Sequence, residues 1–244
     1  MTEGIVSIVF GKEYEEFAIK SIAYSRAYYS GHWQIITNIP KNQLEPKWTE
    51  IKNLDFLHVK DVQDNNRFYK TKLPEYTFYD KTIYMDVDAI IKKDGIDSYF
   101  DVLDNYSIFL NFNLLLLSYS TSPNHYREAI KVLNAEYPLS IFYGACIGVN
   151  KTKKDSAALF DSWYKNWVLT KKGRDMASLA CAVQHTSCSI FVFTDNTLFG
   201  WADSVNSIIQ HEHYKNKISL ALGIKNFKPF KPFDVGKENQ WKIN

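Results

Sequence analysis

The sequence is poor in cysteine, which limits the kinds of protein it can encode. Its three cysteines, Cys146, Cys181 and Cys188, cannot all pair with one another, and none has the close Cys/His spacing of a zinc site. A reducing compartment is the default for such a chain. We therefore expect a cytoplasmic protein.

A long hydrophobic run is also lacking. The most apolar segment, residues 108–119, is interrupted by Asn111 and Asn113, and it is shorter than the ~20 residues needed to cross a bilayer. Residues 1–14 combine a short apolar run with no basic start, so we expect no signal peptide. The sequence predicts no membrane span.

Neither sign of charge dominates the chain. Its 29 basic and 27 acidic residues give a formal net charge of +2 at pH 7, and the lysines are scattered. This excludes the concentrated basic stripe of a nucleic-acid binder, so no nucleic-acid partner is expected. A content of 45% hydrophobic and 23% charged residues in a chain of 244 is typical of a globular protein with one large core.

What the first hundred residues do contain is an alternation of strand and helix patterns. Short apolar runs rich in β-branched residues predict strands at 4–10, 33–38, 56–59 and 82–85. Residues 14–29 have helical spacing, and a mainly parallel central sheet flanked by helices follows from the alternation. The predicted fold class is α/β, with a single Rossmann-like domain.

The second half is less regular. It predicts strands at 107–112, 144–150 and 189–194 and helices at 125–137, 154–170 and 174–186. Glycines in the strand 144–150 permit a close approach of the backbone. We place the domain at 1–222, and we expect the tail 223–244, rich in lysine, proline and aromatics, to pack on it or to stay mobile.

Two aspartates, Asp86 and Asp88, follow the strand 82–85 directly. In an open α/β sheet, ligands bind outside the carboxyl ends of the strands, and the two-residue period sends both side chains to the same side. Paired carboxylates are typical ligands of Mg²⁺ or Mn²⁺, and phosphate oxygens commonly complete the coordination shell of the ion. The alternative is a loop with two solvated aspartates, but the apolar residues on both sides of the pair do not favour it.

The stretch "RFYKTKLPEYTFYDKTIYMDVDAII", residues 67–91, resembles the metal-binding region of GT-A-fold glycosyltransferases, particularly family 8. The resemblance implies a nucleotide-sugar transferase that uses Mn²⁺ (or Mg²⁺). By position, Asp86 and Asp88 would contact the metal and the nucleotide, with Val87 between them, and Arg67 and Lys70 would meet sugar or phosphate oxygens. Lys72 is a close alternative to Lys70.

The start of the chain fits the same family. "IVSIVFGKEY", residues 5–14, is similar to its first strand and loop, which implies that the nucleotide base contacts Phe10, Gly11 and Tyr14. For Tyr14 the alternative is an aromatic side chain packed on the core at the start of a helix.

The resemblance extends to two later segments. Residues 143–150 are similar to the strand that lines the acceptor side, and 173–183 resemble an Asp-Gln-x-x-Leu segment in which Met176 replaces the usual Gln. Asp175 would contact the donor sugar; the alternative is that it only charges the first turn of a helix.

A third metal ligand is implied near the end of the chain. GT-A enzymes often supply a histidine there, and we favour His211, which follows the predicted strand end 207–210, over His213. The family's usual Gly and Lys-Pro-Trp are absent after it, although Lys215 and Lys217 offer cations nearby.

The implied activity is transfer of a sugar, with retention of configuration, from a nucleotide-diphosphate donor, most simply a UDP-sugar, to a hydroxyl of a glycan or other acceptor. One alternative is a nucleotidyltransferase, which should have a Gly-rich phosphate loop with basic residues after the first strand. Another is a non-catalytic glycan-binding module that uses exposed aromatics such as Trp33, Trp48 or Trp241.

Overall fold

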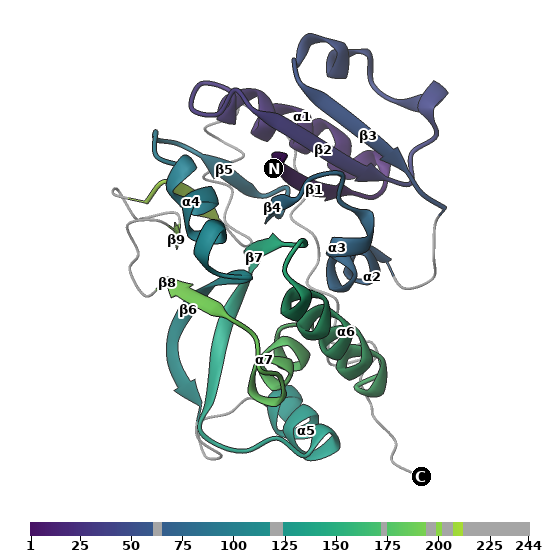
Figure 1. The fold of residues 1–244 in the computed structure, drawn as a ribbon. Coiled ribbons are helices and arrows are strands. Elements are labelled where there is room, and N and C mark those ends of the chain that lie inside the picture. Colours follow the sequence, from purple (N-terminus) through teal and green to yellow (C-terminus); the bar gives the residue numbers. More distant parts are fainter. Residues whose placement is uncertain (61–64, 118–123, 172–174, 194–198, 202–206, 212–244) are drawn as a thin grey trace.

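The computed structural model (Figure 1) describes residues 1–60, 65–117, 124–171, 175–193, 199–201 and 207–211. The predicted tail 223–244 lies outside these residues. A seven-stranded sheet with helices on both faces forms the body of the molecule.

The sheet has the strand order β3-β2-β1-β4-β7-β6-β8. All neighbouring strands run parallel except where β7 lies antiparallel between β4 and β6, so the sheet is mainly parallel, as predicted. The strands are β1 (Glu3–Val9), β2 (His32–Thr37), β3 (Leu54–His58), β4 (Lys81–Met85), β6 (Ile108–Leu117), β7 (Leu139–Asn150) and β8 (Ile190–Phe193).

A second, three-stranded sheet lies beyond the end of β4. Its order is β5-β10-β9, with β10 antiparallel to β5 and parallel to β9. The strands are short: β5 (Ala89–Ile91), β9 (Phe199–Trp201) and β10 (Ile209–His211). This sheet brings residues near position 210 beside the turn that follows β4.

The central strands are apolar throughout because both of their faces are buried. Alternate residues of β1 and β4, such as Ile5 and Ile83, enter one core cluster under helices α1 (Lys12–Ser25) and α4 (Asp97–Asn105). The intervening residues, such as Val6, enter a second cluster on the opposite face.

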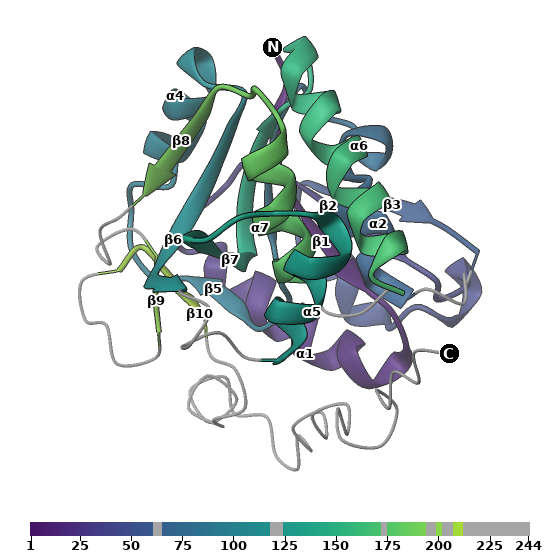
Figure 2. The same cartoon turned by 90° about the horizontal axis from the view of Figure 1, so that it is seen from below.

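Four helices cover that opposite face, and Figure 2 shows α6, α7 and α2 gathered there. They are α2 (Asn65–Thr71), α3 (Leu73–Tyr76), α6 (Lys154–Leu169) and α7 (Asp175–His185). Helix α5 (Asn124–Leu133) packs on α7 and the first half of β7 in a third cluster. No helix among the described residues has the length and apolar character to cross a membrane.

Several element boundaries differ from those predicted. The helix expected at 14–29 ends at Ser25, the helix expected at 125–137 ends at Leu133, and the strand expected at 144–150 begins at Leu139. Asn134 takes φ 52°, a left-handed conformation that ends α5. Strands β5 and β9 and helix α4 were not predicted.

Candidate active site

The turn after β4 carries the two predicted carboxylates. The Asp86 amide donates to the Ala145 carbonyl of β7 at 2.9 Å, and the Ala89 amide donates to the Asp86 carbonyl at 3.0 Å. These bonds fix the turn at both ends, so its side chains emerge at the carboxyl edge of the sheet. The Asp86 and Asp88 side chains are 23% and 29% exposed, enough to meet a ligand.

His211 joins these carboxylates from far along the chain. It ends β10 and lies opposite Ala89 in the antiparallel pairing with β5. Its Nε2 is 3.2 Å from Asp88 Oδ1, and one ligand atom from each of Asp86, Asp88 and His211 falls within 4.8 Å of the others. Burial would lower the pKa of His211, but the carboxylates of Asp88 and Asp86 together outweigh that effect and raise the pKa.

A second charged group lies beside the first. Lys70 of α2 places Nζ 3.2 Å from Asp175 Oδ2 and 3.6 Å from Asp86 Oδ1. Arg67, one turn earlier, places Nε 3.7 Å from Asp175 Oδ1. Four of the residues predicted from the resemblance therefore form one connected set of charges: Arg67, Lys70, Asp86 and Asp175.

Each charge of this set favours the ionised form of its oppositely charged neighbours. Burial would lower the pKa of Lys70, but the carboxylates of Asp175 and Asp86 raise it above its usual value. Burial would raise the pKa of Asp175, but Lys70 and Arg67 hold it below its usual value. Asp175 is the first residue of α7, and its carbonyl accepts from Trp163 Nε1 of α6 at 2.9 Å, which anchors the start of that helix.

Tyr84 is a member of the site that was not predicted. Its hydroxyl donates to Asp86 Oδ1, and Lys70 Nζ lies 4.9 Å from the centroid of its ring. The sequence pattern does not distinguish Tyr84 from the apolar residues of the predicted strand 82–85. The available signal was its spacing, because a residue two before Asp86 points to the same side.

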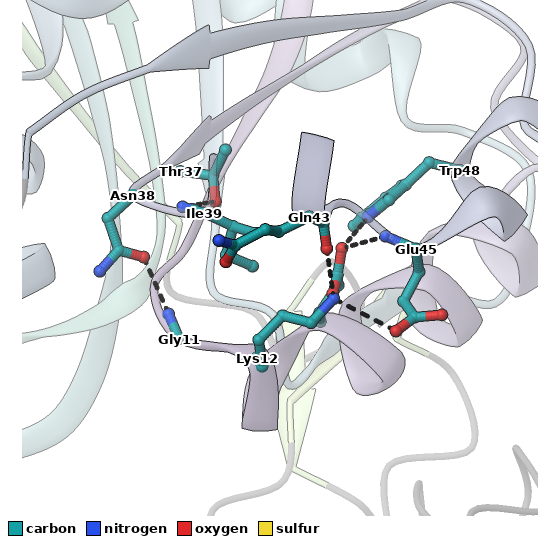
Figure 3. A network of polar contacts seen from close by, with 9 residues as sticks. Gly11, Lys12, Thr37, Asn38, Ile39, Gln43, Glu45 and Trp48 are labelled. Atoms are coloured by element: carbon teal, nitrogen blue, oxygen red, sulfur yellow. Dashed lines mark hydrogen bonds and ion pairs between the residues drawn. The ribbon is translucent and has the colours of Figure 1, made fainter. Parts of the chain in front are cut away.

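The predicted base-binding loop lies at the ends of β1 and β2. Gly11 takes φ 85°, a conformation that favours glycine, and its amide donates to Asn38 Oδ1 at 2.9 Å (Figure 3). Phe10 meets Tyr69 edge-to-face at 5.3 Å. Tyr14 is partly buried against the first core cluster, which agrees with the packing alternative, and a contact with the base stays a prediction.

Lys12 follows this loop and is held by a polar network, shown in Figure 3. Its Nζ lies 2.5 Å from Glu15 Oε2, 2.6 Å from the Gln43 carbonyl and 3.2 Å from Glu45 Oε1. Glu15, only 1% exposed, also accepts from Trp48 Nε1 at 2.9 Å. The network ties the segment after β2 to the start of α1.

Other predicted residues lie differently. Lys72, the alternative to Lys70, pairs with Glu75 at 3.0 Å and lies over the Tyr164 ring, so it is not part of the charged set described above. Val87 packs against the first core cluster, and Met176 packs against the third. His213 lies outside the described residues.

The residues present fit a divalent cation. Two carboxylates and one imidazole converge at the turn, with their ligand atoms within 4.8 Å of one another. Carboxylates suit Mg²⁺ and Mn²⁺, and the imidazole favours Mn²⁺ of the two. The partly exposed position of both aspartates leaves room for further ligands from a bound molecule.

The chain has the GT-A fold, as its mainly parallel central sheet and its structural likeness to two glycosyltransferases show. The galactosyltransferase LgtC, solved in complex with donor and acceptor sugar analogues, matches with a TM-score of 0.59 and 12% identity over 86% of each chain. Mouse xyloside xylosyltransferase 1 in its apo form matches with a TM-score of 0.61 and 8% identity over 86% of this chain and 97% of its own. No known protein-family profile matches the sequence.

Proposed function

We propose that the protein is a metal-dependent glycosyltransferase that moves a sugar from a nucleotide-diphosphate donor, a UDP-sugar, to a hydroxyl of a glycan or other acceptor. The observation that carries this proposal is the convergence of Asp86, Asp88 and His211 at the carboxyl end of β4. It supports binding of a cation together with a diphosphate at the edge where this fold binds ligands.

Different side chains of the site would bind the cation, contact the diphosphate and position the carboxylates. Asp86, Asp88 and His211 would hold a divalent cation, which when bound neutralises charge on the departing diphosphate. Arg67, with a side chain 31% exposed, would meet the diphosphate, whereas the Lys70 side chain, 8% exposed, pairs with Asp86 and Asp175 and holds them in place.

Retention of configuration is the stereochemistry we propose. An inverting enzyme needs a carboxylate that takes the proton of the acceptor hydroxyl. Asp175 is poorly suited to that task, because its ion pairs with Lys70 and Arg67 lower its pKa. The anomer formed in a donor-hydrolysis or transfer assay, read by NMR, tests this point.

The nucleotidyltransferase alternative is disfavoured by Lys12. That class needs a cation after the first strand that can meet phosphates. Lys12 is the only basic residue in "FGKEYEEF", residues 10–17, and its ammonium contacts Glu15 and Glu45.

The glycan-binding alternative predicted that Trp33 and Trp48 are exposed, and that prediction is wrong. Trp33 is 1% exposed and donates to Ser7 Oγ at 3.1 Å, while Trp48 is 4% exposed. Neither ring is available to stack on a sugar. Trp241 lies outside the described residues.

Calorimetric titration with UDP, GDP and CDP, each with Mn²⁺ and with EDTA, tests the proposal. We expect one diphosphate, UDP, to bind only with Mn²⁺, and hydrolysis of its sugar derivatives then identifies the donor. Absence of Mn²⁺-dependent binding for all three would overturn the proposal in favour of a recognition module.

Asp88→Asn tests the site itself. Because Asn keeps the shape but removes the charge of the ligand, we expect Mn²⁺-dependent UDP binding to be lost while the protein still folds and unfolds cooperatively on heating. Asp101→Asn, an exposed position on α4, is the matched control and should bind as the wild type does. Equal UDP affinity in both variants would contradict the assignment of Asp88.

A further inference from the structure

Tyr84 is a buried residue of the central strand β4 whose side chain carries a polar hydroxyl group. The residue is 1% exposed and lies on the face covered by α2, α6 and α7. A buried phenol without a partner costs free energy, and Tyr84 meets that need by donating its hydroxyl to Asp86 Oδ1. Phe would fill the same space without a hydroxyl, so packing alone does not require Tyr at this position.

Lys70 reaches the same carboxylate oxygen from above the Tyr84 ring. Its Nζ is 4.9 Å from the ring centroid and 3.6 Å from Asp86 Oδ1. The aromatic face attracts the ammonium, because the ring quadrupole is negative there. Tyr84 therefore contacts Asp86 through its hydroxyl and the Lys70 ammonium through the face of its ring.

Gly144 of β7 leaves the space that this arrangement needs. A Cβ added at Gly144 would lie 3.1 Å from Lys70 Nζ and 3.6 Å from Met176 Cγ. A side chain at this position would therefore crowd the ammonium of Lys70 and require it to shift. The glycine permits Lys70 to sit between the ring and the two carboxylates.

The contacts select one oxygen of Asp86. Within the described part of the chain, both the Tyr84 hydroxyl and the Lys70 ammonium go to Oδ1. We propose that Tyr84 is a positioning residue of the metal site: with Lys70 it fixes the Asp86 carboxylate so that only Oδ2 serves the cation and nucleotide. This inference rests on the proposed function.

Tyr84→Phe is the direct test, because it keeps the ring and removes only the hydroxyl. Tyr99→Phe is its matched control: Tyr99 is fully buried, and its hydroxyl has no hydrogen-bond partner within the described residues. The affinity for Mn²⁺ at saturating UDP is measured by electron paramagnetic resonance, from the signal of free Mn²⁺. Thermal unfolding of each variant is recorded alongside.

We expect Tyr84→Phe to weaken Mn²⁺ binding by about 10-fold to 100-fold, the usual effect of removing a group that orients a metal ligand. The spectrum of bound Mn²⁺ should also broaden, because the Asp86 carboxylate can rotate. Tyr99→Phe should change neither. A purely structural role for Tyr84 predicts a lower Tm with unchanged Mn²⁺ affinity, and that result would overturn the inference.

Gly144→Ala tests the arrangement without altering Tyr84, and it serves if Tyr84→Phe does not fold. Crowding of Lys70 Nζ should weaken Mn²⁺ binding in the same direction, and wild-type affinity would contradict the inference. The two proposals fail through different results. If the wild type does not bind Mn²⁺ with UDP, the proposed function is wrong, and so is the role of Tyr84. If the wild type binds Mn²⁺ with UDP and the variants bind it with the same affinity, only the role of Tyr84 is wrong.

Discussion

Lys70 and Asp175 place opposite charges where water barely reaches, since their side chains are 8% and 12% exposed. Each makes the burial of the other tolerable, and removing one leaves a charge without compensation. Asp86 retains part of this compensation for Lys70, because it lies 3.6 Å from the same ammonium.

Asp175→Asn should therefore lower the free energy of unfolding at pH 7 by about 2 to 3 kcal/mol. The pKa of Asp175 is lowered in the folded state, so its contribution is present above the unfolded-state value of about 3.9 and is lost as pH falls through the lower folded value. Denaturant unfolding between pH 7 and pH 3 checks both points: the variant should lose less stability in acid. Asp101→Asn is the control, and a variant as stable as the wild type at pH 7 would refute the argument.

At the residue level, the sequence predicted the charged members of the site but not the polar ones. Asp86 and Asp88 were recognisable because a carboxylate pair interrupts an apolar strand end. Tyr84 and Asn38 were not, since tyrosine is common in buried strands and asparagine is common after them. Their roles depend on which atoms they meet, and that is set by the packing of distant segments.

At the level of elements, the glycines of β7 have the close contacts that the sequence predicted. Gly148 pairs with Phe109 of β6, and a Cβ added to it would lie 2.0 Å from the Phe109 ring. Phe109 is fully buried, so its ring has little room to move.

Gly148→Ala should destabilise the protein by about 2 kcal/mol, because it overpacks the junction of β6 and β7. Denaturant unfolding measures this cost. In a Phe109→Leu background the smaller side chain should accept the methyl group, so the cost of Gly148→Ala should fall. An equal cost in both backgrounds would mean that the ring is not the obstacle.

Elements that depend on distant partners escaped prediction. Strand β5 has three residues, Ala89–Ile91, and it exists by pairing with β10, which comes from near the end of the described chain. No local period can indicate such a strand. Helix α4 is also short, and it is held by Tyr99, Phe100 and Leu103 packing into the first core cluster. The long strands and helices with strong local patterns were predicted with shifted ends.

At the scale of the whole molecule, the seven-stranded sheet and the site at its edge should respond together to a ligand. A ligand present at about 100 times its Kd adds about 2.7 kcal/mol to the free energy of unfolding. For a chain of this size, Mn²⁺ with UDP should therefore raise Tm by about 5 to 10 °C. Differential scanning calorimetry checks this, EDTA should abolish the shift, and Asp88→Asn should show none. A Tm that rises equally with UDP in EDTA would contradict a metal-dependent site.

The position of His211 has a consequence for the way the chain is tied together. Asp88 and His211 are separated by about half of the chain, and the short ladder between β5 and β10 holds the two ends of that long loop together. A cation shared by these residues would act as a removable cross-link, and cross-links that close long loops restrict the unfolded chain most. The three-stranded sheet would then be the first part to unfold when the cation is removed, while the seven-stranded sheet stays folded through its own apolar contacts.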